Sequence, residues 1–312
     1  MLNLTFDMEN IKQSELARFG NIEFLAKQVV EGFITGLHKS PFHGFSVEFA
    51  EHRIYNKGES TRHIDWKLFG KTDKLFTKKY EEETNLRCQI VIDTSSSMLF
   101  PVGEKQTKLS FSVLAAASLI ELFKKQRDAV GITLFSDKIN LHTENKSSTR
   151  HHRYLYSELE KCFEQYSTNN KSESATIQTL HDVAELCSQR SLIIIFSDFL
   201  DDPDRRDDFF NALQHLKHNK HEIIVFHTVD TSKEIEFDLE NRPYNIIDME
   251  TGEQIKLQPN QFKEKYTTAI KSYFREIELK CTDYKIDFMK ADINAGYYDI
   301  LLKYLIKRQR MR

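Results

Sequence analysis

Five consecutive residues with oxygen-bearing side chains, at positions 93–97, follow the apolar run at residues 90–92. The stretch reads Ile-Val-Ile-Asp-Thr-Ser-Ser-Ser-Met, so Asp93, Ser95 and Ser97 recur at every second position. One carboxylate and two hydroxyls on a tight loop suit a hard divalent cation such as Mg²⁺, whereas a softer metal would need histidine or cysteine ligands. Alone, the pattern is a weak indication, because such serines also cap helices, here the helix expected after Lys108.

Two further residues strengthen the prediction of a cation site. Thr176 precedes the amphipathic run Ile-Gln-Thr-Leu-His-Asp-Val-Ala-Glu-Leu, and Asp198 ends the apolar run Leu-Ile-Ile-Ile-Phe-Ser-Asp. In an open parallel sheet, ligands bind outside the carboxyl ends of the strands. We therefore expect a hydroxyl and a carboxylate from two more loops at the same edge. Ser174 competes with Thr176 for the hydroxyl role, and Mn²⁺ and Ca²⁺ remain alternatives to Mg²⁺.

Alternating apolar and amphipathic runs predict the elements that position these residues. Four β-branched runs without polar alternation are typical of strands covered on both faces, and each ends at an aspartate. They are residues 89–93, 129–137, 190–198 and 221–230. Runs with apolar residues at helical spacing lie between them, at 108–127, 175–190 and 203–219. This order predicts an α/β fold with a doubly wound, mainly parallel sheet. Taken alone, Asp137 and Asp230 are interpreted as turn or capping residues.

The remaining sequence divides around this core. We expect a helical segment at 1–39 and a small β-rich insertion at 40–88, before a domain at 89–312. Towards the end of that domain we expect a hairpin that turns at Thr251–Gly252, then a helix, a strand and a basic helix.

Composition excludes several classes of protein. The 312 residues carry a formal net charge of −3, which gives no basic field for nucleic acid. No run of about 18 apolar residues and no secretory signal are visible, so we expect no membrane insertion and a cytoplasmic location. The four cysteines are far apart and form no Cys-x-x-Cys pair, which indicates ordinary buried or reduced thiols.

The three-loop set resembles the metal-ion-dependent adhesion site of von Willebrand factor A domains. In that family, an Asp-x-Ser-x-Ser loop, a threonine and an aspartate surround one divalent cation. The resemblance implies that the metal ligands are Asp93, Ser95, Ser97, Thr176 and Asp198. It also implies that a carboxylate from a partner protein completes the coordination. The second loop reads Ser-Glu-Ser-Ala-Thr where the family usually has Gly-Gly-Thr.

A second resemblance covers residues 20–310 and is more specific. The segment before the first core strand contains Arg53-Ile-Tyr55, Gly-Glu, Arg62 and Ile-Asp-Trp66, and it resembles the DUF58 signature, with glutamate where that family usually has aspartate. The resemblance implies a von Willebrand factor A-like domain and a MoxR-type AAA+ ATPase as partner, in the assembly or maturation of other proteins. Arg53, Tyr55, Arg62 and Trp66 either dock a partner or tie the insertion to the sheet.

The alternative function is a metal-dependent phosphoester hydrolase, with the cation as Lewis acid and Asp137 as the spare carboxylate. We expect a binding protein rather than an enzyme, because the neighbouring hydroxyls and acids are already used as ligands. The histidines at 151–152 and 215–221 show no His-Glu-x-x-His frame, and we expect them on solvated faces.

Overall fold

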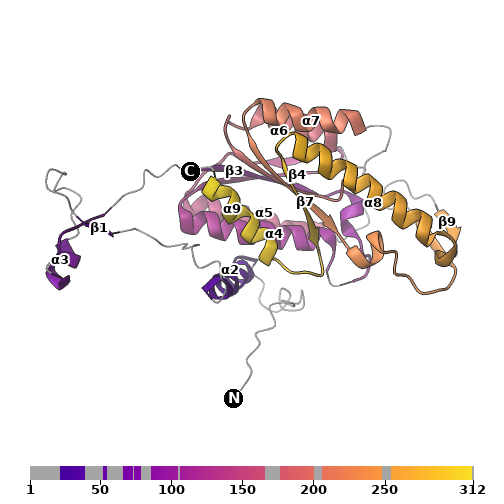
Figure 1. Ribbon diagram of the computed structural model, residues 1–312, viewed down its shortest axis with the longest axis horizontal. Helices are drawn as coiled ribbons and strands as arrows, with labels where there is room; N and C mark the ends of the chain where they lie inside the picture. Colours follow the sequence, from indigo (N-terminus) through magenta and orange to yellow (C-terminus); the bar gives the residue numbers. More distant parts are fainter. Residues whose placement is uncertain are drawn as a thin grey trace, which may run out of the picture.

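A six-stranded sheet forms the centre of the protein in a computed structural model (Figure 1). The structure describes residues 22–38, 52–54, 66–72, 74–78, 86–104, 106–165, 176–199, 206–247 and 254–310. The strand order is β10-β7-β6-β3-β4-β5. The strands are β3 (Arg87–Asp93), β4 (Ala129–Phe135), β5 (Ile139–His142), β6 (Leu192–Ser197), β7 (Glu222–Val229) and β10 (Asp287–Asp292). All neighbours pair in parallel except β4 and β5, which are antiparallel. The prediction of an α/β fold with a mainly parallel sheet is therefore confirmed.

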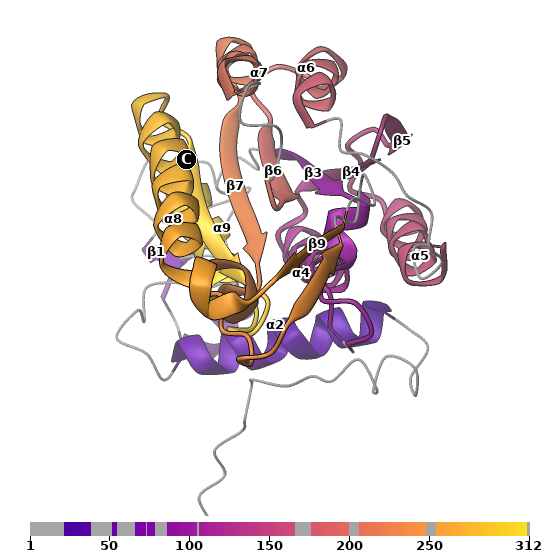
Figure 2. The same ribbon diagram turned by 90° about the vertical axis from the view of Figure 1, so that its right-hand side faces the viewer.

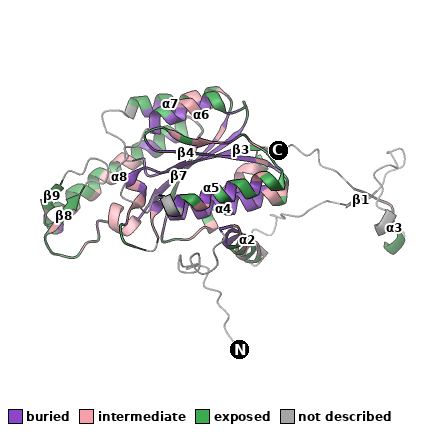
Figure 3. Cartoon of the chain, turned by 180° about the vertical axis from the view of Figure 1, so that it is seen from behind, coloured by how far each residue is buried: buried purple, intermediate pink, exposed green. Residues whose placement is uncertain are grey.

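Helices cover both faces of the sheet, which explains the continuous apolar strands (Figure 2). One face packs against α4 (Lys108–Gln126), α5 (Thr149–Gln165) and α9 (Tyr298–Arg310). The other packs against α6 (Thr176–Leu186), α7 (Arg206–His218) and α8 (Pro259–Asp283). Alternate residues of each strand enter the two cores: Ile90 and Ile92 lie in the first and Val91 in the second. The four central strands β3, β4, β6 and β7 are accordingly buried along almost their whole length (Figure 3), whereas the edge strands β5 and β10 are only partly buried.

Helix α4 is an interior helix, because α2 (Ile22–His38) packs against it as an additional layer. Every side chain from Lys108 to Phe123 is buried. The helix begins with its own capping box. The side chain of Thr107 accepts a hydrogen bond from the backbone N–H of Ser110, and the side chain of Ser110 accepts one from the backbone N–H of Thr107. The start of α4, and with it Lys108, is thereby fixed at the carboxyl edge of the sheet.

Two elements of the core were not predicted, and both lie between β4 and β6. The buried positions of α5, including Leu155, Leu159 and Cys162, do recur at helical spacing, but most of the other residues of the helix are polar or charged, and its overall hydrophobicity is low. Strand β5 is a short edge strand of four residues. The expectation that the histidines are solvated is wrong at His152 and His221, whose exposed fractions are 2% and 0%, because these two face the packed interior.

The region predicted as a β-rich insertion contains a small antiparallel pair. Strand β1 (His52–Ile54) pairs with β2 (Phe76–Lys78), and the helix α3 (Trp66–Thr72), which was not predicted, lies between them in the chain. The later hairpin is present as β8 (Tyr244–Ile247) and β9 (Gln254–Leu257). Its expected turn at 251–252 lies outside the described residues.

All four cysteines are free and buried, as predicted. Within the described ranges, no helix is both long and apolar enough to cross a membrane.

Gly131 marks the tightest point of the sheet. A Cβ built there would lie 2.5 Å from Asn145 Oδ1, 2.5 Å from the backbone oxygen of Thr143 and 2.7 Å from Gln89 Oε1. We expect Gly131→Ala to lower the free energy of unfolding by about 3 kcal/mol, because the backbone oxygen has no room to retreat. Gly70→Ala is the matched control, since nothing lies within 4 Å of its Cβ. Equal stability of the two variants in urea unfolding would contradict the prediction.

Candidate functional site

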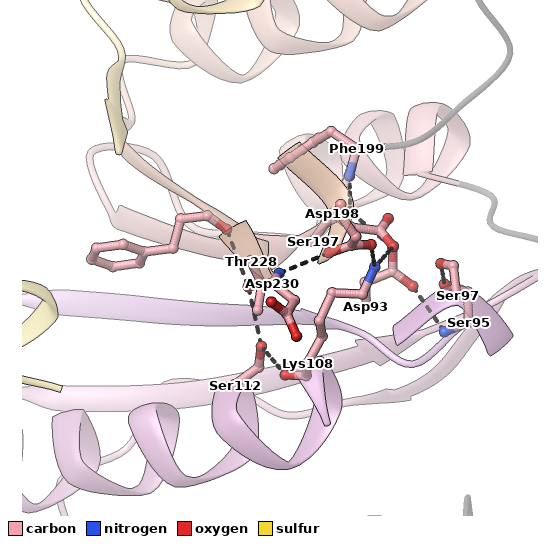
Figure 4. Close-up of polar contacts among 12 residues, drawn as sticks. Asp93, Ser95, Ser97, Lys108, Ser112, Ser197, Asp198, Phe199, Thr228 and Asp230 are labelled. Atoms are coloured by element: carbon pink, nitrogen blue, oxygen red, sulfur yellow. Dashed lines mark hydrogen bonds and ion pairs between the residues drawn. The ribbon is translucent and has the colours of Figure 1, made fainter. Parts of the chain in front are cut away.

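The candidate site lies at the point where the chain changes direction across the sheet. From β3 the chain continues to β4 on one side, whereas β6 continues to β7 on the other, and β3 and β6 are neighbours. The connections after these two strands therefore diverge at their carboxyl ends, which is the position called the crevice in open α/β sheets and the place where such sheets bind ligands. Asp93 is the last residue of β3, and Asp198 directly follows β6 (Figure 4).

Asp93 is held rigidly by two hydrogen bonds. Its Oδ1 accepts from the backbone N–H of Ser95 at 2.9 Å, and its Oδ2 accepts from Ser197 Oγ at 2.9 Å. The side chain of Ser197 in turn accepts from the backbone N–H of Phe199 at 3.1 Å. The loops after β3 and β6 are thus joined through the Asp93 carboxylate, which is fully buried.

The hydroxyls of the first loop do not cap a helix. Ser95 precedes the short helical turn η2 (Ser96–Leu99), but its side chain makes no capping hydrogen bond. Its Oγ lies 3.0 Å from the Oγ of Ser97. Helix α4 takes its cap from Thr107 instead. The interpretation of these serines as caps of the helix at Lys108 is therefore wrong, and two adjacent hydroxyl oxygens lie beside Asp93.

A buried lysine that the sequence did not reveal completes the charge arrangement. Lys108 Nζ donates to Asp198 Oδ2 at 2.7 Å and to Glu234 Oε1 at 2.6 Å. Its side chain is only 1% exposed. Burial alone would lower the pKa of Lys108, but the charges of Asp198 and Glu234 outweigh it and raise the pKa. The ammonium group is therefore charged, and it orients Asp198.

Negative charge nevertheless exceeds positive charge in the crevice. Among these residues, three carboxyl groups accompany one ammonium group: Lys108 contacts Asp198 and Glu234, and Asp93 lies close enough to Asp198 to feel its charge. Burial, and then the charge of Asp198, raise the pKa of Asp93 to about 7. Burial also raises the pKa of Glu234, although Lys108 opposes this shift. Additional positive charge would be stabilised here.

The second-loop residue Thr176 is the first residue of α6 and is 1% exposed. Because α6 leads into β6, which runs towards the crevice, the start of α6 lies at the same edge of the sheet. Its competitor Ser174 lies outside the described residues.

The predicted docking residues lie largely outside the described structure. Tyr55 and Arg62 are not described, and Arg53 and Trp66 are described only as members of β1 and α3, without their side chains. Asp137 is exposed in the turn after β4, where it accepts a hydrogen bond from Ser136 Oγ at 3.0 Å. Asp230 caps the helical turn η4 (Thr231–Ile235) by accepting from the backbone N–H of Lys233, as a capping residue would.

The donor set suits a hard cation. Within the described residues, no three His, Cys, Asp or Glu side chains gather as a metal site. The candidate set instead combines the carboxylates of Asp93 and Asp198 with the hydroxyls of Ser95 and Ser97, and magnesium and calcium prefer such oxygen ligands. The excess negative charge around Asp93 is what a divalent cation would balance.

Sequence reasoning missed Lys108, Ser197 and Glu234. Lys108 stands at the first position of a helix, where a positive charge opposes the helix dipole, and this mismatch was the one available signal. Ser197 directly precedes Asp198, but nothing in a single strand end shows a contact with Asp93. Glu234 lies 126 residues from Lys108 in the sequence, so its pairing depends on the fold.

Comparison with known proteins places the chain among proteins whose function is not established. Curated relatives include uncharacterized proteins of Mycobacterium bovis and Mycobacterium tuberculosis, each 27% identical over 103 residues, which are 33% of this chain and 32% of the relative. This chain thus aligns with about a third of the length of those proteins.

Two solved structures match this chain at low similarity. BatB from Bacteroides thetaiotaomicron has a TM-score of 0.45 at 14% identity, covering 72% of this chain and 98% of that one. An aerotolerance-related membrane protein from Bacteroides fragilis has a TM-score of 0.45 at 13% identity, covering 71% and 99%. The family model described as "Protein of unknown function DUF58" matches residues 51–274, well over half of the chain. The chain therefore belongs to the DUF58 family.

Proposed function

We propose that this protein is a cation-dependent binding module that recognises a carboxylate on a partner protein. The observation that supports this most is the pairing of two buried carboxylates, Asp93 and Asp198, at the crevice between β3 and β6, with fewer positive charges than negative ones. Asp93, Ser95, Ser97 and Asp198 would hold Mg²⁺, or Mn²⁺ or Ca²⁺, and Thr176 would contribute from the start of α6. When bound, the cation supplies an electrophilic position that a partner carboxylate can occupy.

The residues of the chain itself prepare this site. The N–H of Ser95 and the hydroxyl of Ser197 fix both oxygens of Asp93, so little conformational entropy remains to be lost on binding. Lys108 fixes Asp198 from the opposite side and couples it to Glu234 in η4. A partner that contacts η4 would therefore alter the contact between Glu234 and Lys108, and through Lys108 the position of the Asp198 carboxylate in the cation site.

The proposed partner is a MoxR-type AAA+ ATPase, and the proposed role is that of an adaptor in the assembly or maturation of other proteins. This part of the proposal is supported by the resemblance to A domains within the DUF58 family. Asp137, the spare carboxylate of the hydrolase alternative, lies exposed in the turn after β4 rather than in the crevice, so we propose binding and not hydrolysis.

The proposal is tested with a purified MoxR-type ATPase captured on the immobilised protein, in Mg²⁺ and in EDTA. We expect capture of the wild type in Mg²⁺, loss of capture in EDTA, and loss in Asp93→Ala in both buffers. Asp137→Ala serves as a matched control, because it removes an exposed carboxylate at another strand end. Capture that is equal in Mg²⁺ and EDTA would remove the cation from the binding mechanism.

A further inference from the structure

A second site is built on the face of the sheet that packs against α8. A cavity of about 270 Å³ opens there between η4, α8 and the strands β7 and β10. The helix contributes Lys271, Phe274 and Arg275, which recur at helical spacing and so share one face. The strands contribute His227 and Lys290. These two are cross-strand partners in the parallel pair of β7 and β10, so their side chains lie on the same face.

His227 is a buried polar side chain, and one of its ring atoms has no hydrogen-bond partner among the residues that the structure describes. Its exposed fraction is 2%. Its ring donates a hydrogen bond to the backbone carbonyl of Asp198. Its Nε2 has no hydrogen-bond partner within the described part of the chain, so the donor to Asp198 is Nδ1. Nε2 therefore carries a lone pair, and it is the hydrogen-bond acceptor that His227 brings to the wall of the cavity.

The His227 ring is fixed by aromatic neighbours. Its centroid lies 3.9 Å from that of Phe274 and 5.9 Å from that of Phe288, with a stacked interplanar angle of 20° to the latter. Burial lowers the pKa of His227. A buried acceptor without a partner costs about 1–3 kcal/mol, which a hydrogen-bond donor in the cavity would recover.

Positive charge dominates the mouth of the cavity. Lys271, Arg275 and Lys290 are exposed and line it, against one acidic residue, Glu278. Glu278 is bound to Arg275, with 2.7 Å between Oε2 and Nη1. Across the described ranges, neither Lys271 nor Lys290 forms an ion pair. A ligand here would be an anion, and the same charges disfavour a metal cation at Nε2.

We propose that this cavity binds a small hydroxylated phosphate ester, with the phosphate against Lys271 and Lys290 and a hydroxyl that donates to His227 Nε2. The volume lies just below the range of about 300–1,000 Å³ typical of pockets for drug-sized ligands, so the organic part is only a few carbons long. The aromatic walls of Phe274 and Phe288 would cover that part. The residues that line this cavity include none of the proposed cation ligands.

The test is a calorimetric titration of glycerol 3-phosphate into the full-length protein in EDTA, which makes the result independent of cation binding. We expect saturable 1:1 binding that becomes about tenfold weaker in Lys271→Gln and in Lys290→Gln, because each removes a charge-assisted contact. Lys265→Gln is the matched control, since Lys265 is exposed on the same helix and does not line the cavity. It should bind as the wild type does.

Two further arms separate the roles of charge and donor. Sulfate at matched ionic strength carries the charge without an O–H group, and glycerol carries the hydroxyls without the charge. Both should bind at least tenfold more weakly than glycerol 3-phosphate. In His227→Phe the aromatic packing is retained and the acceptor is lost, so the preference for glycerol 3-phosphate over sulfate should disappear. Absence of binding to the wild type, or equal binding by the wild type and both lysine variants, would overturn the proposal.

Discussion

Asp93→Asn should stabilise the cation-free protein at neutral pH while it abolishes the response to Mg²⁺. In the folded protein the pKa of Asp93 is raised from 3.8 to about 7, because of burial and then the charge of Asp198. The folded state therefore disfavours the ionised carboxylate. The contribution of Asp93 to stability is complete below pH 4 and is lost as the pH rises through 7. Asparagine stays neutral and escapes this loss, which is on the order of 4 kcal/mol.

The measurement is urea unfolding of the wild type and Asp93→Asn in EDTA at pH 5 and pH 8. We expect the stability of the variant relative to the wild type to increase from pH 5 to pH 8. Addition of Mg²⁺ at pH 8 should stabilise the wild type and leave the variant unchanged. Asp137→Asn, an exposed substitution, should show neither effect. If the difference in free energy of unfolding between Asp93→Asn and the wild type were the same at pH 5 and pH 8, ionisation of Asp93 would not destabilise the folded protein. That result would contradict the raised pKa of Asp93.

Lys108→Met should be the most destabilising single substitution at the site. The ammonium is 1% exposed and lies within 2.7 Å of Asp198 and 2.6 Å of Glu234. Without it, the carboxylates of Asp198 and Glu234 both lose the buried ammonium that they share. Breaking a buried pair in this way costs about 3–5 kcal/mol. Saturating Mg²⁺ should recover part of the loss, because a divalent cation bound beside Asp198 supplies positive charge in place of the lysine.

Lys161→Met provides the matched control for this prediction. Lys161 also contacts a glutamate, Glu158, at 2.7 Å, but its side chain is 49% exposed. Exposed pairs contribute about 0.2–1 kcal/mol. The double variant of Lys108→Met with Glu234→Gln should be less destabilised than the sum of the two single variants, because Glu234→Gln removes one of the unpaired charges. If Lys108→Met lowered the free energy of unfolding no more than Lys161→Met does, the predicted contribution of the buried ion pair to stability would be contradicted.

The sheet was predictable because burial on both faces leaves a direct trace in the sequence. The runs at 89–93 and 221–230 are apolar at consecutive positions, and the structure places β3 and β7 there with both faces covered. Helix α5 carries a weaker trace, because its buried residues recur at helical spacing but form only a stripe on a helix of low overall hydrophobicity. Its histidines and glutamates lie in the same turns as Leu155 and Leu159.

The sequence predicted those site residues that carry a ligand oxygen and also lie at the end of a recognisable strand. Asp93, Ser95 and Ser97 share one loop, and Asp198 ends a recognisable strand, so strand topology alone brings them to one edge. Lys108 belongs to the site through pairing with Asp198, 90 residues away in sequence. Such a contact depends on how far α4 extends and on how its first turn faces, which no local pattern encodes.

The most direct test of cation binding is a calorimetric titration of Mg²⁺ into the wild type and into Ser95→Ala, at pH 8 and at pH 6. We predict one site in the wild type, with tighter binding at pH 8, because Asp93 must lose its proton before it can act as a ligand. Ser95→Ala removes one hydroxyl and should weaken binding at both pH values without unfolding the protein. No binding by the wild type at pH 8, or identical binding by the wild type and Ser95→Ala, would contradict a cation site at the end of β3.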